Sequence, residues 1–96
     1  MLEIRSACEH CGKALPNSSR EAIICSFECT YCEHCAIQLF QNVCPGCGGN
    51  FERRPVRPAK LLEKYPVSER KLVAPKSGPE LRALIDKYKN IKPEDR

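Results

Sequence analysis

The spacing of eight cysteines is the feature that most constrains this 96-residue chain. They form four pairs, Cys8/Cys11, Cys25/Cys29, Cys32/Cys35 and Cys44/Cys47. A chain of this length buries too little apolar surface to offset the conformational entropy that it loses on folding. We therefore expect disulfides or metal ions to hold the fold together.

The context of the cysteines favours metal. No continuous apolar run that would suit a signal peptide or a membrane span is present, so we expect a cytoplasmic chain without membrane contact, whose thiols stay reduced. Zinc takes four thiolates in a tetrahedron, and a CxxC turn directs two sulfurs at one ion. Four pairs therefore predict two Zn²⁺ ions in two closed four-cysteine sites.

Each pair has a characteristic local sequence. The CxxC pairs that begin at Cys8 and Cys44 are each followed by glycine, which is typical of zinc knuckles. The apolar residues of segment 36–43 recur with helical spacing, so we expect Cys32 and Cys35 in the first turn of a helix. Cys25 and Cys29 border a short strand or hairpin, in which residues 22–24 would pack under that helix.

Two assignments of ligands to zinc remain open. In the interleaved assignment, the first zinc binds Cys8, Cys11, Cys32 and Cys35, and the second binds Cys25, Cys29, Cys44 and Cys47. In the sequential assignment, the first two pairs share one ion and the last two pairs share the other. We favour the interleaved assignment because it joins a knuckle to a helix start at one site and a hairpin to a knuckle at the other, as treble-clef sites require.

Over residues 8–51, this pattern resembles RING-type cross-brace domains, including the closing Cys-Pro-x-Cys pair. More closely, residues 24–35, 44–49 and 54–58 look like the bacterial family called domain of unknown function 1272, with a match through about residue 70. The resemblance implies a small α+β, zinc-stabilised domain with a short hairpin and one central helix. It implies a prokaryotic zinc-binding protein without an assigned activity.

The departures from the RING pattern argue against a ubiquitin ligase, which carries an apolar residue in its first knuckle. Here that knuckle holds Glu9 and His10. Four thiolates leave no zinc position for water, and no cysteine is spare as a nucleophile, so we expect no catalytic residue and no small-molecule substrate. We expect a non-catalytic protein-interaction or adaptor module. His10 and His34 are expected to be partner contacts or solvated side chains rather than ligands.

The two halves of the chain carry formal charges of opposite sign. Residues 1–50 carry a formal charge of −2 and residues 51–96 carry +6, within a total of +4. Eight thiolates and two zinc ions change the first half to −6, so we expect part of residues 53–64 to lie against it. The cations Arg53, Arg54, Arg57 and Lys60 are candidate partner contacts, and nucleic-acid binding through this basic tail is the alternative function.

We divide the chain into a two-zinc module (residues 1–52), a Pro/Arg-rich extended tail and linker (53–76) and a C-terminal end with a helix (77–96). Ser77 and Glu80 match a capping box, and the helix should run from Pro79 to position 88 or 89. Its apolar stripe is a second candidate partner surface, made of Leu81, Leu84, Ile85 and Tyr88. Whether the stripe docks on the module, on a partner or on a second copy stays open.

Overall fold

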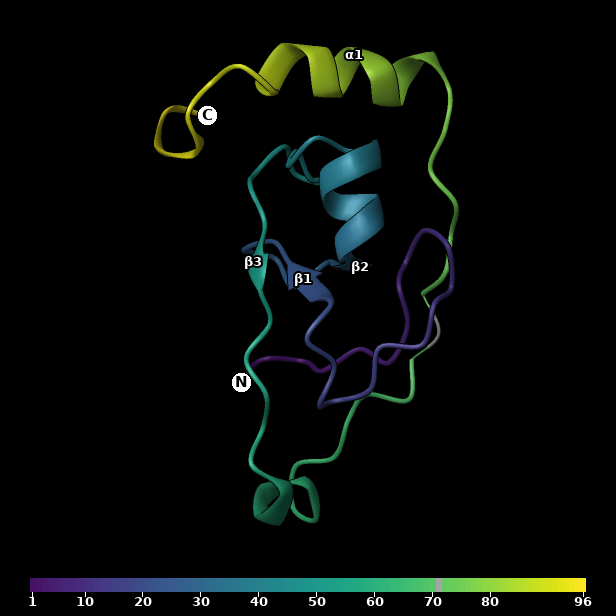
Figure 1. Cartoon of the computed structure of the whole chain (residues 1–96), viewed down its shortest axis with the longest axis vertical. Coiled ribbons are helices and arrows are strands. Elements are labelled where there is room, and N and C mark those ends of the chain that lie inside the picture. Colours follow the sequence, from purple (N-terminus) through teal and green to yellow (C-terminus); the bar gives the residue numbers. More distant parts are fainter. Residues whose placement is uncertain (71) are drawn as a thin grey trace.

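The computed structural model describes residues 1–70 and 72–96. In chain order its elements are β1 (Ala22–Ile24), β2 (Thr30–Cys32), the π-helix η1 (His34–Leu39), β3 (Glu52–Arg53), the 3-10 helix η2 (Ala59–Leu62), α1 (Pro79–Tyr88) and the 3-10 helix η3 (Pro93–Asp95). The molecule measures 42 × 26 × 18 Å, with α1 at one end of the long axis and η2 at the other (Figure 1).

A three-stranded antiparallel sheet lies at the centre, in the order β2-β1-β3. The expected hairpin is present as β1 and β2, and Ile23 of β1 pairs with Tyr31 of β2. Tyr31 is buried between Phe40 and Phe51, with ring centroids 5.1 and 5.6 Å away in edge-to-face geometry. The structure thus has the expected small α+β fold, with its core beside the hairpin.

The central helix is wider than an α-helix. The backbone N–H of Phe40 donates to the carbonyl of Cys35, five residues back, which is the hydrogen-bond spacing of a π-helix. The prediction that both Cys32 and Cys35 lie in its first turn was wrong for Cys32. Cys32 pairs with Ala22 and ends strand β2, so only Cys35 lies in the helix.

The two predicted zinc knuckles have matching backbones. In knuckle 1 (residues 8–13), the N–H of Gly12 donates to the Cys8 carbonyl at 3.0 Å, and in knuckle 2 (residues 44–49), the N–H of Gly48 donates to the Cys44 carbonyl at 2.8 Å. Gly12 and Gly48 both have φ = +80°, a left-handed conformation that glycine adopts without steric cost. The same turn therefore occurs twice.

Arg54 fastens the start of the tail to the module. Its side chain is only 2% exposed, and its guanidinium donates to the carbonyls of Arg5 at 2.7 Å, Leu15 at 3.0 Å and Pro16 at 2.8 Å. The tail does lie against the module, as the charge asymmetry suggested. However, the acceptors are neutral backbone carbonyls rather than acidic side chains, because the irregular N-terminal segment leaves these carbonyls without partners in the sheet.

Arg57 makes a second attachment of the same kind. Its guanidinium donates to the carbonyls of Leu2 and Tyr65, and its backbone N–H donates to the Asn17 side chain at 3.0 Å. Further along, the backbone N–H of Ser68 donates to the carbonyl of Ile4 at 2.8 Å. The segment that we expected as a linker therefore runs along the module and is bonded to it.

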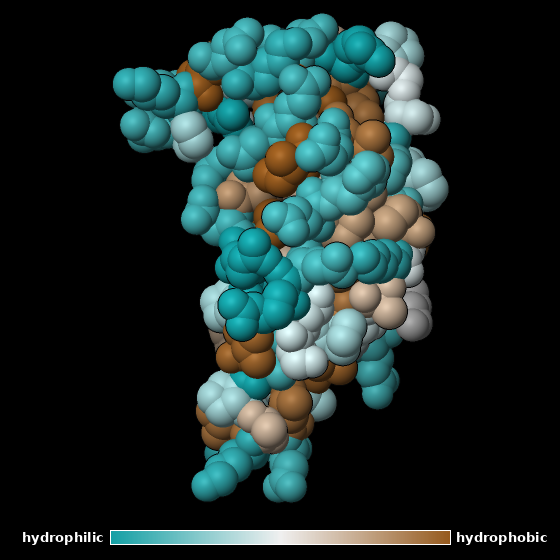
Figure 2. Space-filling view, viewed as in Figure 1, coloured by the Kyte–Doolittle hydropathy of each residue, from teal (hydrophilic) through white to brown (hydrophobic). Residues whose placement is uncertain are grey.

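Helix α1 covers one end of the module. It spans Pro79–Tyr88, as predicted, but the capping box was wrong because Gly78 holds the N-cap position and no side chain caps the helix. Ile85 is buried, and the rest of the apolar stripe packs on the core, so the stripe docks on its own chain. The outer face of α1 is hydrophilic (Figure 2). Within residues 1–70 and 72–96, no helix is long and apolar enough to cross a membrane.

The three carbonyl contacts of Arg54 predict a large effect of its removal. Replacing Arg54 by methionine keeps the bulk but removes a donor from three carbonyls, of which only that of Pro16 keeps another, the N–H of Ser19. This loss should lower the free energy of unfolding by about 2–4 kcal/mol. Arg53→Met is the matched control, because Arg53 is exposed and its removal should cost less than about 0.5 kcal/mol. Urea unfolding at a fixed free zinc concentration measures both, and equal costs would contradict this role of Arg54.

The two knuckle glycines predict unequal effects of alanine. Gly12→Ala should cost about 1–2 kcal/mol of unfolding free energy for its left-handed backbone. Gly48→Ala should cost more, because its new Cβ would lie 3.0 Å from the Tyr88 ring. In a double-mutant cycle, Tyr88→Ala should remove the extra cost at Gly48 and leave the cost at Gly12 unchanged. Equal costs for the two glycine variants would show that this close approach is unimportant.

Candidate metal centre

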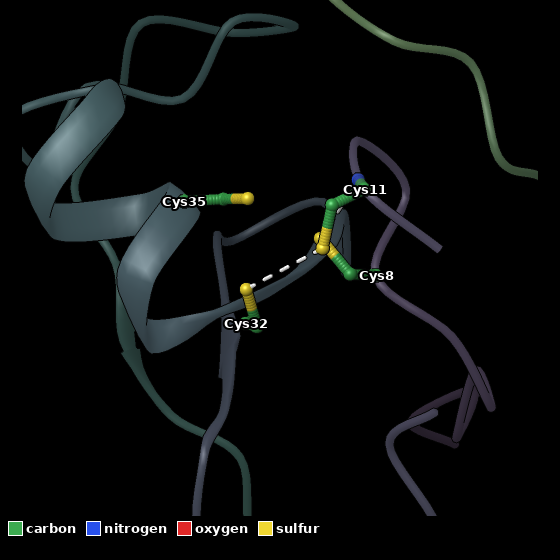
Figure 3. A group of neighbouring side chains, drawn as sticks. All are labelled: Cys8, Cys11, Cys32 and Cys35. Atoms are coloured by element: carbon green, nitrogen blue, oxygen red, sulfur yellow. Dashed lines mark hydrogen bonds between the residues drawn. The ribbon is translucent and has the colours of Figure 1, made fainter. Parts of the chain in front are cut away.

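The first cysteine group joins a loop, a strand end and a helix. The sulfurs of Cys8, Cys11, Cys32 and Cys35 all lie within 4.8 Å of one another. Cys8 and Cys11 come from knuckle 1, Cys32 ends β2, and Cys35 projects from η1 toward the other three side chains (Figure 3). The residues that meet here are those of the interleaved assignment.

The spacing of these sulfurs suits a tetrahedral zinc ion. With Zn–S bonds of about 2.3 Å, the sulfurs of a tetrahedron are about 3.8 Å apart. The sulfurs of Cys11 and Cys32 are 3.8 Å apart, and all eight cysteines are free of disulfide bonds. Four sulfurs without oxygen ligands are the donor set that zinc shares with iron–sulfur centres. The first cysteine group thus fits a closed, four-thiolate metal site.

The second cysteine group joins the hairpin turn to knuckle 2. The sulfurs of Cys25, Cys44 and Cys47 lie within 4.8 Å of one another. The sulfur of Cys29 is outside this close group but lies beside it, because a Cβ built on Gly46 would be 3.6 Å from the Cys29 sulfur and 3.8 Å from the Cys44 sulfur. Cys25 and Cys29 lie between β1 and β2, and the other two cysteines belong to knuckle 2. These four residues are the remaining set of the interleaved assignment.

Backbone amides point at sulfur in both groups. The N–H of Cys11 donates to the sulfur of Cys8 at 3.5 Å, and the N–H of Gly46 donates to the sulfur of Cys44 at 3.4 Å. In the hairpin turn, the N–H of Phe27 donates to the sulfur of Cys25 at 3.3 Å. Such bonds favour the charged thiolate, the form that binds metal.

Without a cation, the second group does not hold four thiolates. The hydrogen bond from Cys44 lowers the pKa of Cys25 to about 5, whereas burial and the bond with Cys25 raise the pKa of Cys29 to about 11. The same bond with Cys25, together with burial, raises the pKa of Cys44. One thiolate is therefore stabilised at the expense of its neighbours. A divalent cation removes this conflict by neutralising the charge that the thiols share.

The first group has the same conflict in a milder form. Burial raises the pKa of Cys35, with a further contribution from its hydrogen bond with Cys32. Burial also opposes ionisation of Cys8, but hydrogen bonds from the backbone at Cys11 and Cys32 outweigh it and lower the Cys8 pKa. Both groups thus present sulfurs that converge and need a cation to ionise together.

Glu9 supports the first site in a way that the sequence analysis missed. Its buried carboxylate accepts a hydrogen bond from the backbone N–H of Thr30, at the start of β2, and another from Arg5 at 3.0 Å. These bonds tie knuckle 1 to the strand that carries Cys32. No local pattern indicates this role, because the residue that Glu9 contacts lies 21 positions further along the chain.

The histidines lie beside the sites and have different surroundings. Nδ1 of His10 accepts a hydrogen bond from the backbone N–H of Lys76 at 2.8 Å, and its ring packs edge-on against Phe40 at 5.2 Å. His10 is half-buried and has a structural role, because these two contacts hold its ring in place. His34 is exposed on η1. Neither belongs to the converging cysteine groups.

The four basic residues that we predicted to contact a partner fall into two groups, two bonded within the chain and two exposed. Arg54 and Arg57 are occupied by the carbonyls described above. Arg53 is exposed, 3.8 Å from the carboxylate of Glu33, and Lys60 is exposed on η2. The four cations therefore do not form one free patch, because two of them hold the tail on the module.

Comparison with known proteins confirms the family resemblance that the sequence analysis proposed. The chain is 49% identical over 75 residues to an uncharacterised protein of Rhizobium meliloti (strain 1021), covering 78% of this chain and 89% of that protein. No solved structure matches it. Residues 1–57 match the model of a protein family of unknown function, DUF1272, and these residues include both cysteine groups. The chain therefore belongs to the DUF1272 family.

Proposed function

We propose that this chain binds two Zn²⁺ ions and serves as a non-catalytic module that presents a rigid surface to another protein. The convergence of the sulfurs in two interleaved groups is the observation that carries the proposal. Zinc would be held by Cys8, Cys11, Cys32 and Cys35 at one site and by Cys25, Cys29, Cys44 and Cys47 at the other. Structural zinc contributes about 10 kcal/mol or more per site to folding.

A closed ligand set argues for a structural rather than a catalytic role. A catalytic zinc keeps one position for water, whereas four thiolates occupy all four positions of a tetrahedron. The eight cysteines are all used in this scheme, so none serves as a nucleophile. The chemistry left to the module is recognition by its surface.

Exposed apolar side chains on the rigid parts of the module support a protein as the partner. Phe27 is 71% exposed at the tip of the turn between Cys25 and Cys29. Ile37 and Leu39 are exposed on η1. Nucleic acid receives less support, because Arg54 and Arg57 are committed to carbonyls inside the molecule. Contacts through apolar side chains on a zinc-fixed scaffold fit a protein surface.

Counting metal ions tests the zinc assignment. Native mass spectrometry should find two zinc ions per chain, and Cys32→Ser should retain only one or none, because it removes a ligand of the first site. Ser26→Ala is the matched control, since it alters the turn of the second site without touching a ligand, and it should retain both. Chelation should unfold residues 8–47, as measured by amide exchange. Fewer than two zinc ions in the unmodified chain would overturn the two-site assignment.

Affinity capture from native cells tests the choice of partner. The full chain should retain a protein and no nucleic acid, and Phe27→Ser should weaken that capture without lowering the zinc content. Lys60→Ala is the control, because it removes an exposed cation of the basic tail and should leave protein capture unchanged. If Lys60→Ala abolishes binding and the captured material is nucleic acid, the alternative function replaces this one.

A further inference from the structure

The C-terminal part of the chain contacts both knuckles at equivalent positions. In knuckle 1, a Cβ built on Gly12 would lie 3.7 Å from the side chain of Val73. In knuckle 2, a Cβ built on Gly48 would lie 3.0 Å from the ring of Tyr88. We call residues 72–96 the strap, because this segment runs past knuckle 1 and then across knuckle 2 as α1 (Figure 1).

Each of these glycines follows the exposed ligand of its knuckle. Cys11 precedes Gly12 and Cys47 precedes Gly48, and these are the two exposed cysteines of the eight. An incoming ligand therefore reaches zinc most easily at these two sulfurs. The strap packs beside the residue that must move if either exposed sulfur is to swing away from the ion.

Hydrogen bonds reinforce the contact at knuckle 1. The backbone N–H of Ala74 donates to the carbonyl of Glu9 at 2.8 Å. Two residues later, the N–H of Lys76 donates to Nδ1 of His10 at 2.8 Å. Glu9 and His10 are the two residues between the cysteines of this knuckle. Unwinding the turn therefore requires that both bonds to the strap break.

The end of the chain reinforces the contact at knuckle 2. The guanidinium of Arg96 donates to the carbonyl of Asn42 at 2.8 Å and to the carbonyl of Gly48 at 3.4 Å. Gly48 is thus contacted by two residues of the strap, the ring of Tyr88 at the end of α1 and the guanidinium of Arg96 eight residues later. The strap thus restrains both knuckles without supplying a metal ligand.

The attachment of the strap is light enough to be reversible. Only Ile85 of α1 is buried, and no side chain caps the helix. A cavity of about 490 Å³ separates α1 from η1, lined by residues that include His10, Phe40 and Leu81. An isolated helix of ten residues is marginal in water, so α1 depends on this partial packing. Local opening of the strap therefore costs less than unfolding the module.

We infer that the strap controls zinc exchange by holding each knuckle closed around its exposed cysteine. This inference rests on the proposed zinc binding and adds a kinetic role for residues outside the ligand set. Cys11 and Cys47 would be the first thiolates that a competing ligand displaces from zinc, each taking up a proton as it is displaced, and opening of the knuckle would permit this exchange. Because the contacts at the two knuckles are separate, the strap acts on each site through different residues.

The kinetics of zinc release test this inference in the full chain. Tyr88→Ala should accelerate transfer of one zinc ion to a chromogenic chelator by about tenfold, the change expected for losing about 1.4 kcal/mol of packing. Iodoacetamide labelling followed by peptide mapping should show faster modification of Cys47 and an unchanged rate at Cys11. Arg82→Ala is the matched control, because Arg82 is exposed on the same helix, and it should leave both rates unchanged.

Further variants keep the test decisive if Tyr88→Ala folds poorly. Arg96→Ala removes the bonds to Asn42 and Gly48 at the chain end and should accelerate the same site by at least about threefold, the change expected from losing even one of these two hydrogen bonds. Ala74→Pro removes the N–H that bonds to Glu9 and should accelerate labelling of Cys11 instead. Unchanged rates of zinc transfer and cysteine labelling, or equal acceleration at both sites in every variant, would overturn the inference that the strap controls zinc exchange. Native mass spectrometry of the starting proteins separates this result from a failure of zinc binding.

Discussion

The need to bring thiolates together around a cation is the constraint on which the rest of this structure depends. In the part of the chain that the structure describes, no strand is longer than three residues, so the sheet alone contributes few hydrogen bonds and little burial. The first cysteine group ties residue 8 to residue 35, and the second ties residue 25 to residue 47. Because these ranges overlap, neither group can open without straining the hairpin that both share. The interleaving converts two local sites into one cooperative unit.

Around this unit, two arginine side chains supply hydrogen bonds that regular secondary structure supplies in larger proteins. The N-terminal segment and the tail are mostly irregular, so many carbonyls lack partners in a sheet or helix. Arg54 supplies donors to three of them and Arg57 to two more. Guanidinium suits this task because its donors lie in a fixed plane and stay charged. The positive charge of the tail therefore stabilises the fold as well as setting the surface potential.

The sequence predicted the parts of the structure that depend on local pattern. The hairpin and the span Pro79–Tyr88 follow from spacing and from turn residues, whereas the cysteine spacing left two groupings of the four pairs open and the interleaved one was only favoured. It did not predict that Arg54 would be buried, because its acceptors at Leu15 and Pro16 lie 39 and 38 positions away. Nor did apolar spacing distinguish a π-helix from an α-helix. The burial of Arg54 depends on which distant carbonyls lack a donor, and no local pattern records this.

Linkage between the strap and the zinc sites follows from where its contacts fall. Ala74 bonds to a residue whose carbonyl is placed by knuckle 1, and Tyr88 packs on a glycine whose left-handed backbone belongs to knuckle 2. These contacts require formed knuckles, and under the proposed function the knuckles form around zinc. Whatever free energy the strap adds to zinc binding, zinc must therefore add to the ordering of the strap, because coupling between two equilibria is reciprocal. Under the proposed function, zinc binding and the docking of α1 are therefore coupled, although no residue of α1 would be a ligand.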